Sequence, residues 1–192
     1  MYRTRVVDAA VADVLTYSGG LLIEGVRACG KTETGRRHAR SEVALDSGAP
    51  AVEAILAADP GLLLRGEVPR LLDEWQLEPS LWNRVRREID VRQAKGQFIL
   101  TGSSVPAEDA QRHSGAHRIS RIRMRPMTLA EQGRGTGAVS LASLFKGEEL
   151  PVSLDGTVSV PDALQALAHG GWPGDLEATT AQTQRHLRDY AE

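Results

Sequence analysis

A short stretch bracketed by glycines carries residues that could bind phosphate. Residues 25–32 read GVRACGKT, and Lys31 and Thr32 directly follow the second glycine. In such loops, small residues let successive backbone N–H groups turn toward a phosphate at the amino end of a helix. The lysine then reaches the β- and γ-phosphates, and the threonine hydroxyl binds Mg²⁺. The pattern predicts a nucleotide-binding loop formed by Gly25, Val26, Arg27, Ala28, Cys29, Gly30, Lys31 and Thr32. A tight turn with a surface lysine is the alternative.

The flanking residues favour the phosphate loop over a chance match. This motif acts as a phosphate loop when a buried strand precedes it and a helix follows it. Leu21-Leu22-Ile23 is a short apolar run that predicts a strand buried on both faces, and residues 31–41 are compatible with a polar helix. Cys29, the only cysteine, is expected to line the loop as a small residue.

An acidic pair about forty residues further on suggests the metal site and the general base. Apolar residues lead from Arg70 into Asp73-Glu74, which predicts carboxylates at the end of a strand. Asp73 there could hold Mg²⁺ through a water, and Glu74 could polarise the water that attacks a phosphate. The alternative is that the two acids merely begin a loop.

Two further places could contact the γ-phosphate. Thr101-Gly102-Ser103-Ser104 follows the apolar run FIL, and this polar strand end could position the attacking water, or it could simply cap the strand. Arg118 precedes an alternating strand. It could approach the γ-phosphate of its own site or of a neighbouring subunit, or it could be a surface arginine.

The elements that must position these residues alternate along the chain. Helical periodicity covers residues 6–17, an apolar stripe follows Pro79, Ser80 is a suitable N-cap, and Lys95-Gly96 is expected to close that helix. Strands are expected near residues 21–23, 43–46, 70–73, 98–102 and 119–125. Strands that alternate with helices predict a parallel sheet with crossover helices.

Composition narrows the class of protein. The chain has 192 residues, of which 41% are hydrophobic and 25% charged, with a net charge of −2 and a single cysteine. No apolar run approaches the ~20 residues of a membrane span, and the amino end lacks the apolar core of a secretory signal. We therefore expect a cytoplasmic protein without membrane contact.

Several motifs in series resemble one family. EGVRACGKT, RLLDEWQLEPSLWNRVRREID, GQFILTGSS, SGAHRI and RMRPMTLAEQ resemble prokaryotic AAA-type P-loop ATPases that carry a C-terminal domain of unknown function. The resemblance implies a RecA-like α/β fold, with five parallel strands flanked by helices and a small, partly helical C-terminal extension. It also implies Asp73 for Mg²⁺, Glu74 as base, Ser103 as sensor and Arg118 as a γ-phosphate arginine.

The chain departs from this family in two places. His117 stands where relatives usually have glycine before the arginine, and relatives continue well past the GGWPG segment at residues 170–174, whereas this chain stops at Glu192. We expect an ATPase domain over residues 1–132, a loop-rich linker over 133–160, and the start of an apparently truncated helical region over 161–192.

These features together predict a protein that binds ATP and hydrolyses it with Mg²⁺, and a homo-oligomer is compatible with them. The alternative is a nucleotide-gated regulatory or interaction module with negligible hydrolysis, whose DNA or protein partner could contact the arginine row at 121, 123 and 125. A small-molecule kinase is a third reading, but no acceptor pocket or lid is evident in the sequence.

Overall fold

The computed structural model describes residues 2–102, 115–134, 141–149 and 159–191. Ser103 and Ser104, predicted near the γ-phosphate, lie outside the described residues. Contacts divide the chain into two compact units, which are described separately: one holds Tyr2 and residues 4–125, and the other holds Arg3 and the residues from Pro126 on. This division comes slightly before the domain end predicted at residue 132, and the domain assignment itself remains a proposal.

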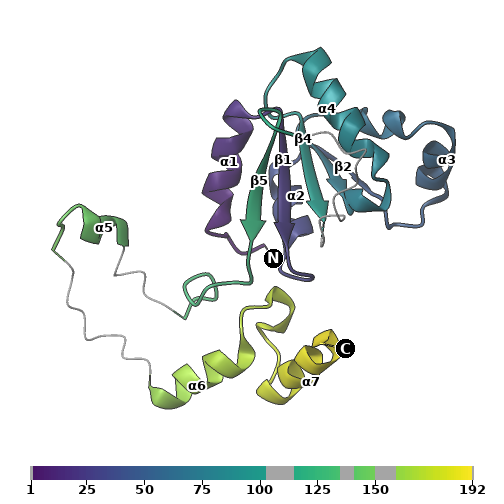
Figure 1. Cartoon of the computed structure of the whole chain (residues 1–192). Coiled ribbons are helices and arrows are strands. Elements are labelled where there is room, and N and C mark those ends of the chain that lie inside the picture. Colours follow the sequence, from purple (N-terminus) through teal and green to yellow (C-terminus); the bar gives the residue numbers. More distant parts are fainter. Residues whose placement is uncertain (1, 103–114, 135–140, 150–158, 192) are drawn as a thin grey trace. The chain divides into compact units, whose positions relative to one another are not determined.

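The first unit is a parallel sheet with helices on both faces. Its five strands lie in the order β2-β3-β4-β1-β5 (Figure 1), and every pair is parallel. The strands are β1 (Gly20–Gly25), β2 (Ser41–Ala44), β3 (Arg70–Asp73), β4 (Phe98–Gly102) and β5 (Ile119–Met124). The predicted α/β fold with a five-stranded parallel sheet is therefore confirmed.

The segment before β1 and the segments that connect β1, β2, β3 and β4 contain helices. They are α1 (Val7–Tyr17), α2 (Lys31–His38), α3 (Pro50–Ala58), the short 3₁₀ turns Pro60–Leu64 and Trp75–Leu77, and α4 (Ser80–Arg92). Figure 1 shows α1 beside the β5 edge of the sheet and α3 beyond the β2 edge.

Each central strand alternates between two hydrophobic cores because its successive side chains point to opposite faces. Leu22, Leu72 and Leu100 pack with Trp82 of α4 and with partly buried residues of α3. Leu21, Leu71 and Ile99 pack on the other face with Val11 and Val14 of α1. Burial on both faces explains why β1 is an uninterrupted apolar run in the sequence.

The ends of α4 differ from the sequence prediction. Ser80 is the first helical residue rather than the N-cap, and its amide donates to the Glu78 carboxylate at 3.2 Å. The helix ends at Arg92, before the predicted Lys95-Gly96, because Gln93 adopts a left-handed conformation with φ of 49°. Helix ends depend on local capping contacts that hydrophobic periodicity does not encode.

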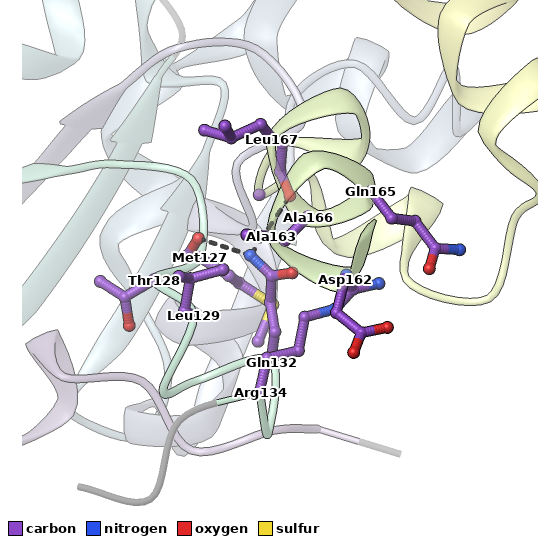
Figure 2. Close-up of a pocket in the computed structure, with 12 residues that line it drawn as sticks. Met127, Thr128, Leu129, Gln132, Arg134, Asp162, Ala163, Gln165, Ala166 and Leu167 are labelled. Atoms are coloured by element: carbon purple, nitrogen blue, oxygen red, sulfur yellow. Dashed lines mark hydrogen bonds between the residues drawn. The ribbon is translucent and has the colours of Figure 1, made fainter. Parts of the chain in front are cut away.

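The second unit joins two motifs that are distant in the sequence. It contains α5 (Leu141–Phe145), α6 (Val160–His169), a 3₁₀ turn at Pro173–Asp175 and α7 (Thr180–Ala191). The Met127 amide donates to the Gly171 carbonyl at 2.6 Å. The Gln132 side-chain amide donates to the carbonyls of Met127 and Gly170, at 3.1 and 3.2 Å (Figure 2). The segment after β5 is therefore bound to the GGWPG segment.

These contacts border a cavity of about 950 Å³ with mainly apolar walls, which include Met127, Leu129, Ala166 and Leu167 (Figure 2). Leu129 and Leu167 are also among the exposed apolar side chains of this unit. Within the described part of the chain, no helix combines the length and hydrophobicity that crossing a membrane requires.

Candidate functional site

The predicted phosphate loop joins β1 to α2 at the carboxyl edge of the sheet. Gly25 ends β1 and Lys31 begins α2, so the loop lies between a buried strand and a helix amino terminus. Ala28 and Gly30 have positive φ angles of 60° and 100°. Left-handed residues interspersed in a loop turn neighbouring N–H groups toward one side, which produces a concavity suited to an anion.

Gly25 has a separate steric role at the start of this loop. A Cβ atom there would lie 2.4 Å from the Met124 carbonyl oxygen of β5 and 3.0 Å from the Cys29 Sγ atom. The backbones of β1 and β5 therefore approach each other too closely for any side chain at this position.

The Lys31 ammonium and the Thr32 hydroxyl of the motif both form hydrogen bonds with neighbouring oxygen atoms. Lys31 is buried, with 5% of its surface exposed, and its Nζ atom donates to the Val26 carbonyl at 2.9 Å. This bond folds the lysine back across the loop. The Thr32 hydroxyl donates to Asp73 Oδ1 at 2.9 Å. The start of α2 and the end of β3 thus meet at one pair of oxygen atoms.

Asp73 lies at the meeting point of three elements. It ends β3, it is 6% exposed, and the hydroxyl of Thr101 on β4 also donates to its Oδ1 atom. β4 lies between β1 and β3 in the sheet, so its carboxyl end reaches into the space between the phosphate loop and the acid. Two oxygen atoms, one from Asp73 and one from Thr32, match the hard donors that Mg²⁺ prefers.

Glu74 follows in a left-handed conformation, with φ of 53°. This backbone turn ends β3 and starts the 3₁₀ turn at Trp75–Leu77. The Gln76 side-chain amide donates to the Glu74 carboxylate. Gln76 Oε1 is buried and, within the described residues, has no hydrogen-bond partner. The second acid of the pair is therefore restrained by its own loop.

The structure places Arg118 away from the phosphate loop of its own chain. Arg118 directly precedes β5, and its carbonyl accepts a bond from the Gly20 amide at the beginning of β1. The loop begins at the opposite end of β1, about 16 Å away for a strand rise of ~3.3 Å per residue. The Arg118 guanidinium instead donates to Asp90 at 2.6 Å. In this geometry Arg118 lies at the end of the sheet opposite the phosphate loop of its own chain, and its contact with a γ-phosphate, within one chain or between copies, stays a prediction.

Cys29 is a buried part of the loop wall. It is fully buried and packs in the same core as Val11 and Met124. Burial raises the pKa of its thiol, whereas the charges of Lys31 and Arg5 act in the opposite direction. A raised pKa reduces the thiolate fraction, so the structural position agrees with the expected lining role.

Sequence reasoning missed one residue at this site, Arg5. Arg5 is 6% exposed, and its guanidinium donates at 2.9 Å to the carbonyl of Cys29 and at 2.9 Å to that of Arg125. Arg5 precedes α1 and lies in a polar segment outside the phosphate-loop motif. The only signal in the sequence was the regular spacing of Tyr2, Arg5 and Asp8.

A parallel sheet whose β1 strand enters a GxxxxGKT loop, with an acid at the end of β3 bonded to the threonine of that loop, defines a P-loop nucleoside triphosphatase fold. A family model described as AAA domain matches residues 18–132, which is more than half of the chain. The chain therefore belongs to the AAA domain family, and this membership supports nucleotide binding. A comparison with curated proteins found no match.

Proposed function

We propose that this protein binds ATP and hydrolyses it to ADP and phosphate in a reaction that requires Mg²⁺. The observation that carries the proposal is the hydrogen bond between Thr32 and Asp73, at 2.9 Å, with Glu74 next in the chain. It joins the Thr32 hydroxyl to the Asp73 carboxylate, the candidate metal ligand, with the candidate base Glu74 next to it. An acid pair that merely began a loop would not require contact with the phosphate loop.

Each residue has a distinct role in this proposal. The backbone amides of residues 25–32 hold the β-phosphate, and Lys31 leaves the Val26 carbonyl to neutralise charge on the β- and γ-phosphates. Glu74 accepts a proton from the water that attacks the γ-phosphate in line. Ser103, which follows the described end of β4, is proposed to sense the γ-phosphate.

Thr32 and Asp73 would hold the metal ion, Asp73 through a water. Mg²⁺ at this position neutralises charge on the phosphate oxygens. Their mutual hydrogen bond, at 2.9 Å, supports this pairing because it brings the two oxygen atoms together.

A second candidate function is a nucleotide-gated module that hydrolyses slowly by itself. The position of Arg118 supports it, because this arginine pairs with Asp90 and lies at the end of the sheet opposite the phosphate loop of its own chain. A homo-oligomer could supply Arg118 between copies. DNA binding through Arg121 is less well supported, because Arg121 contacts Glu24 at 3.3 Å and lies over the Trp82 ring.

Phosphate release and ATP binding, measured on the wild type, Lys31→Ala and Glu74→Gln, test the proposal. Lys31→Ala is expected to lose ATP binding. Glu74→Gln is expected to bind ATP normally but to release phosphate about 10²–10⁴-fold more slowly, because the amide cannot accept the proton. The matched controls Lys95→Ala and Glu53→Gln change exposed side chains outside the site and should behave as wild type.

Hydrolysis is excluded if wild type releases phosphate no faster than Lys31→Ala. Measurement over a range of protein concentrations separates the two candidates. A specific activity that rises with concentration and is lost in Arg118→Ala supports assistance between copies. Normal ATP binding with no turnover at any concentration favours the nucleotide-gated module.

A further inference from the structure

The residues before α1 form a connected network around the phosphate loop. Arg5 contacts the loop through the Cys29 carbonyl and the end of β5 through the Arg125 carbonyl. These two carbonyls belong to segments far apart in the sequence. A planar guanidinium can bond two acceptors in fixed directions, which a flexible ammonium group cannot do.

The bond to Cys29 fixes the orientation of one peptide group in the loop. The carbonyl of Cys29 and the amide of Gly30 belong to the same planar, trans peptide unit, so they point in opposite directions. While Arg5 holds the carbonyl on one side, the Gly30 N–H must point to the other. Gly30 has a φ of 100°, and Ala28, two residues earlier, has a φ of 60°. Left-handed residues of this kind are typical of an anion-binding concavity.

Arg5 is itself held in place by its neighbours. Its backbone amide donates to Asp8 Oδ2 at 2.7 Å, and Asp8 Oδ1 accepts from the Tyr2 hydroxyl at 2.7 Å and lies 3.1 Å from His38 Nε2. The Tyr2 hydroxyl also lies 3.1 Å from the Thr34 hydroxyl of α2. The segment from Tyr2 to Asp8 therefore contacts both the loop and the helix that follows it.

We propose that Arg5 is a positioning residue for nucleotide binding: it holds the Cys29–Gly30 peptide in the orientation that turns the Gly30 amide toward the phosphate. This inference rests on the proposed nucleotide-binding function of the loop. It assigns the amino-terminal segment, which lies outside the phosphate-loop motif, a direct influence on affinity for ATP.

The test compares Arg5→Lys with Arg70→Lys. Arg70 is a matched control because its guanidinium also donates to a backbone carbonyl, that of Leu63, but lies at the start of β3, at the edge of the sheet opposite the loop. Both changes keep the positive charge and remove the two-point geometry. ATP affinity is measured with Mg²⁺ by calorimetry, and thermal unfolding is measured without nucleotide.

We expect Arg5→Lys to weaken ATP binding roughly tenfold or more, which corresponds to the loss of one charge-assisted hydrogen bond, whereas Arg70→Lys binds as wild type. A purely structural role would lower the unfolding temperature of Arg5→Lys without changing its affinity for ATP, and that result would overturn the proposal. If Arg5→Lys does not fold, Asp8→Asn loosens the support of Arg5 and should weaken ATP binding in the same direction. Unchanged affinity in that variant also overturns the proposal.

Hydrogen exchange of the nucleotide-free protein separates this inference from the proposed function. If wild type binds no ATP, the proposed function fails. The role of the Arg5 contact is then tested by the hydrogen-exchange rates of the backbone amides of residues 28–32. Faster exchange of these amides in Arg5→Lys than in Arg70→Lys supports the positioning role, and equal exchange contradicts it.

Discussion

Replacement of Gly25 by alanine should displace the phosphate loop, because the new side chain would clash with the neighbouring strand β5. The added Cβ would lie 2.4 Å from the Met124 carbonyl oxygen, to which β1 is paired through Gly25. Ordinary contacts between these atom types are about 1 Å longer. Because the contacting atom is backbone in a paired strand, β1 and β5 must separate or the loop must shift. Overpacking of this kind costs about 1–3 kcal/mol.

Part of this cost is offset, because alanine restricts the unfolded chain more than glycine and stabilises by about 0.4–1 kcal/mol. The expected net loss in the free energy of unfolding is therefore about 1–2 kcal/mol. ATP binding should suffer more than stability. A 1 Å displacement at a site can cost about 10²-fold in activity, and the loop begins at this residue.

Urea denaturation gives the stability and calorimetry gives the affinity for ATP. Gly174→Ala is the control, since a Cβ there meets no atom within 4 Å. Gly25→Ala combined with Cys29→Ala removes the sulfur contact and leaves the carbonyl contact, so it should recover little. If Gly25→Ala is as stable as Gly174→Ala and binds ATP as wild type, the close approach of β1 and β5 is not as described.

Two further predictions concern Tyr2 and the metal site. Burial, assisted by Asp8, raises the pKa of Tyr2 to about 12. The folded state thus holds the phenolic proton more tightly than the unfolded state, and this stabilisation is present below about pH 10 and is lost as the pH rises toward 12. The difference is worth about 1 kcal/mol after allowance for solvent screening. In urea denaturation, the free energy of unfolding of Tyr2→Phe should therefore fall less between pH 9.5 and 11.5 than that of the wild type. An equal fall in both proteins would contradict this prediction. Thr32→Val should raise the Mg²⁺ concentration for half-maximal phosphate release about tenfold or more, because the ion loses the Thr32 hydroxyl as a ligand, whereas Thr32→Ser should not. Equal Mg²⁺ titrations of the two variants would show that Thr32 does not hold the metal.

The sequence was sufficient to predict the sheet and the phosphate loop because both depend on local patterns. Apolar runs such as Leu21–Ile23 identify strands buried on both faces, and GxxxxGKT occupies one continuous segment. The contact between Thr32 and Asp73 was also foreseeable, because residues that follow parallel strands gather at one edge of the sheet.

Arg5 and Arg118 show which features local patterns do not encode. Arg5 acts through a fold that brings residue 5 to residues 29 and 125, and no local periodicity reports such contacts. The position of Arg118 could have been inferred, since a residue that precedes a parallel strand lies at the edge opposite the residues that follow one.

The hydrogen bonds between Met127 and Gly171, and between Gln132 and Gly170, have a practical consequence for dividing this protein into fragments. A fragment that stops at residue 132, where the family match ends, would keep Met127 and Gln132 but discard the glycine carbonyls that accept their bonds. It would also expose the side chain of Met127, which is only 5% exposed in the full chain, to solvent. Truncation after Arg125, at the boundary between the two compact units, removes Met127 and Gln132 together with their acceptors. It is therefore the better end point for a fragment that contains the phosphate-loop unit.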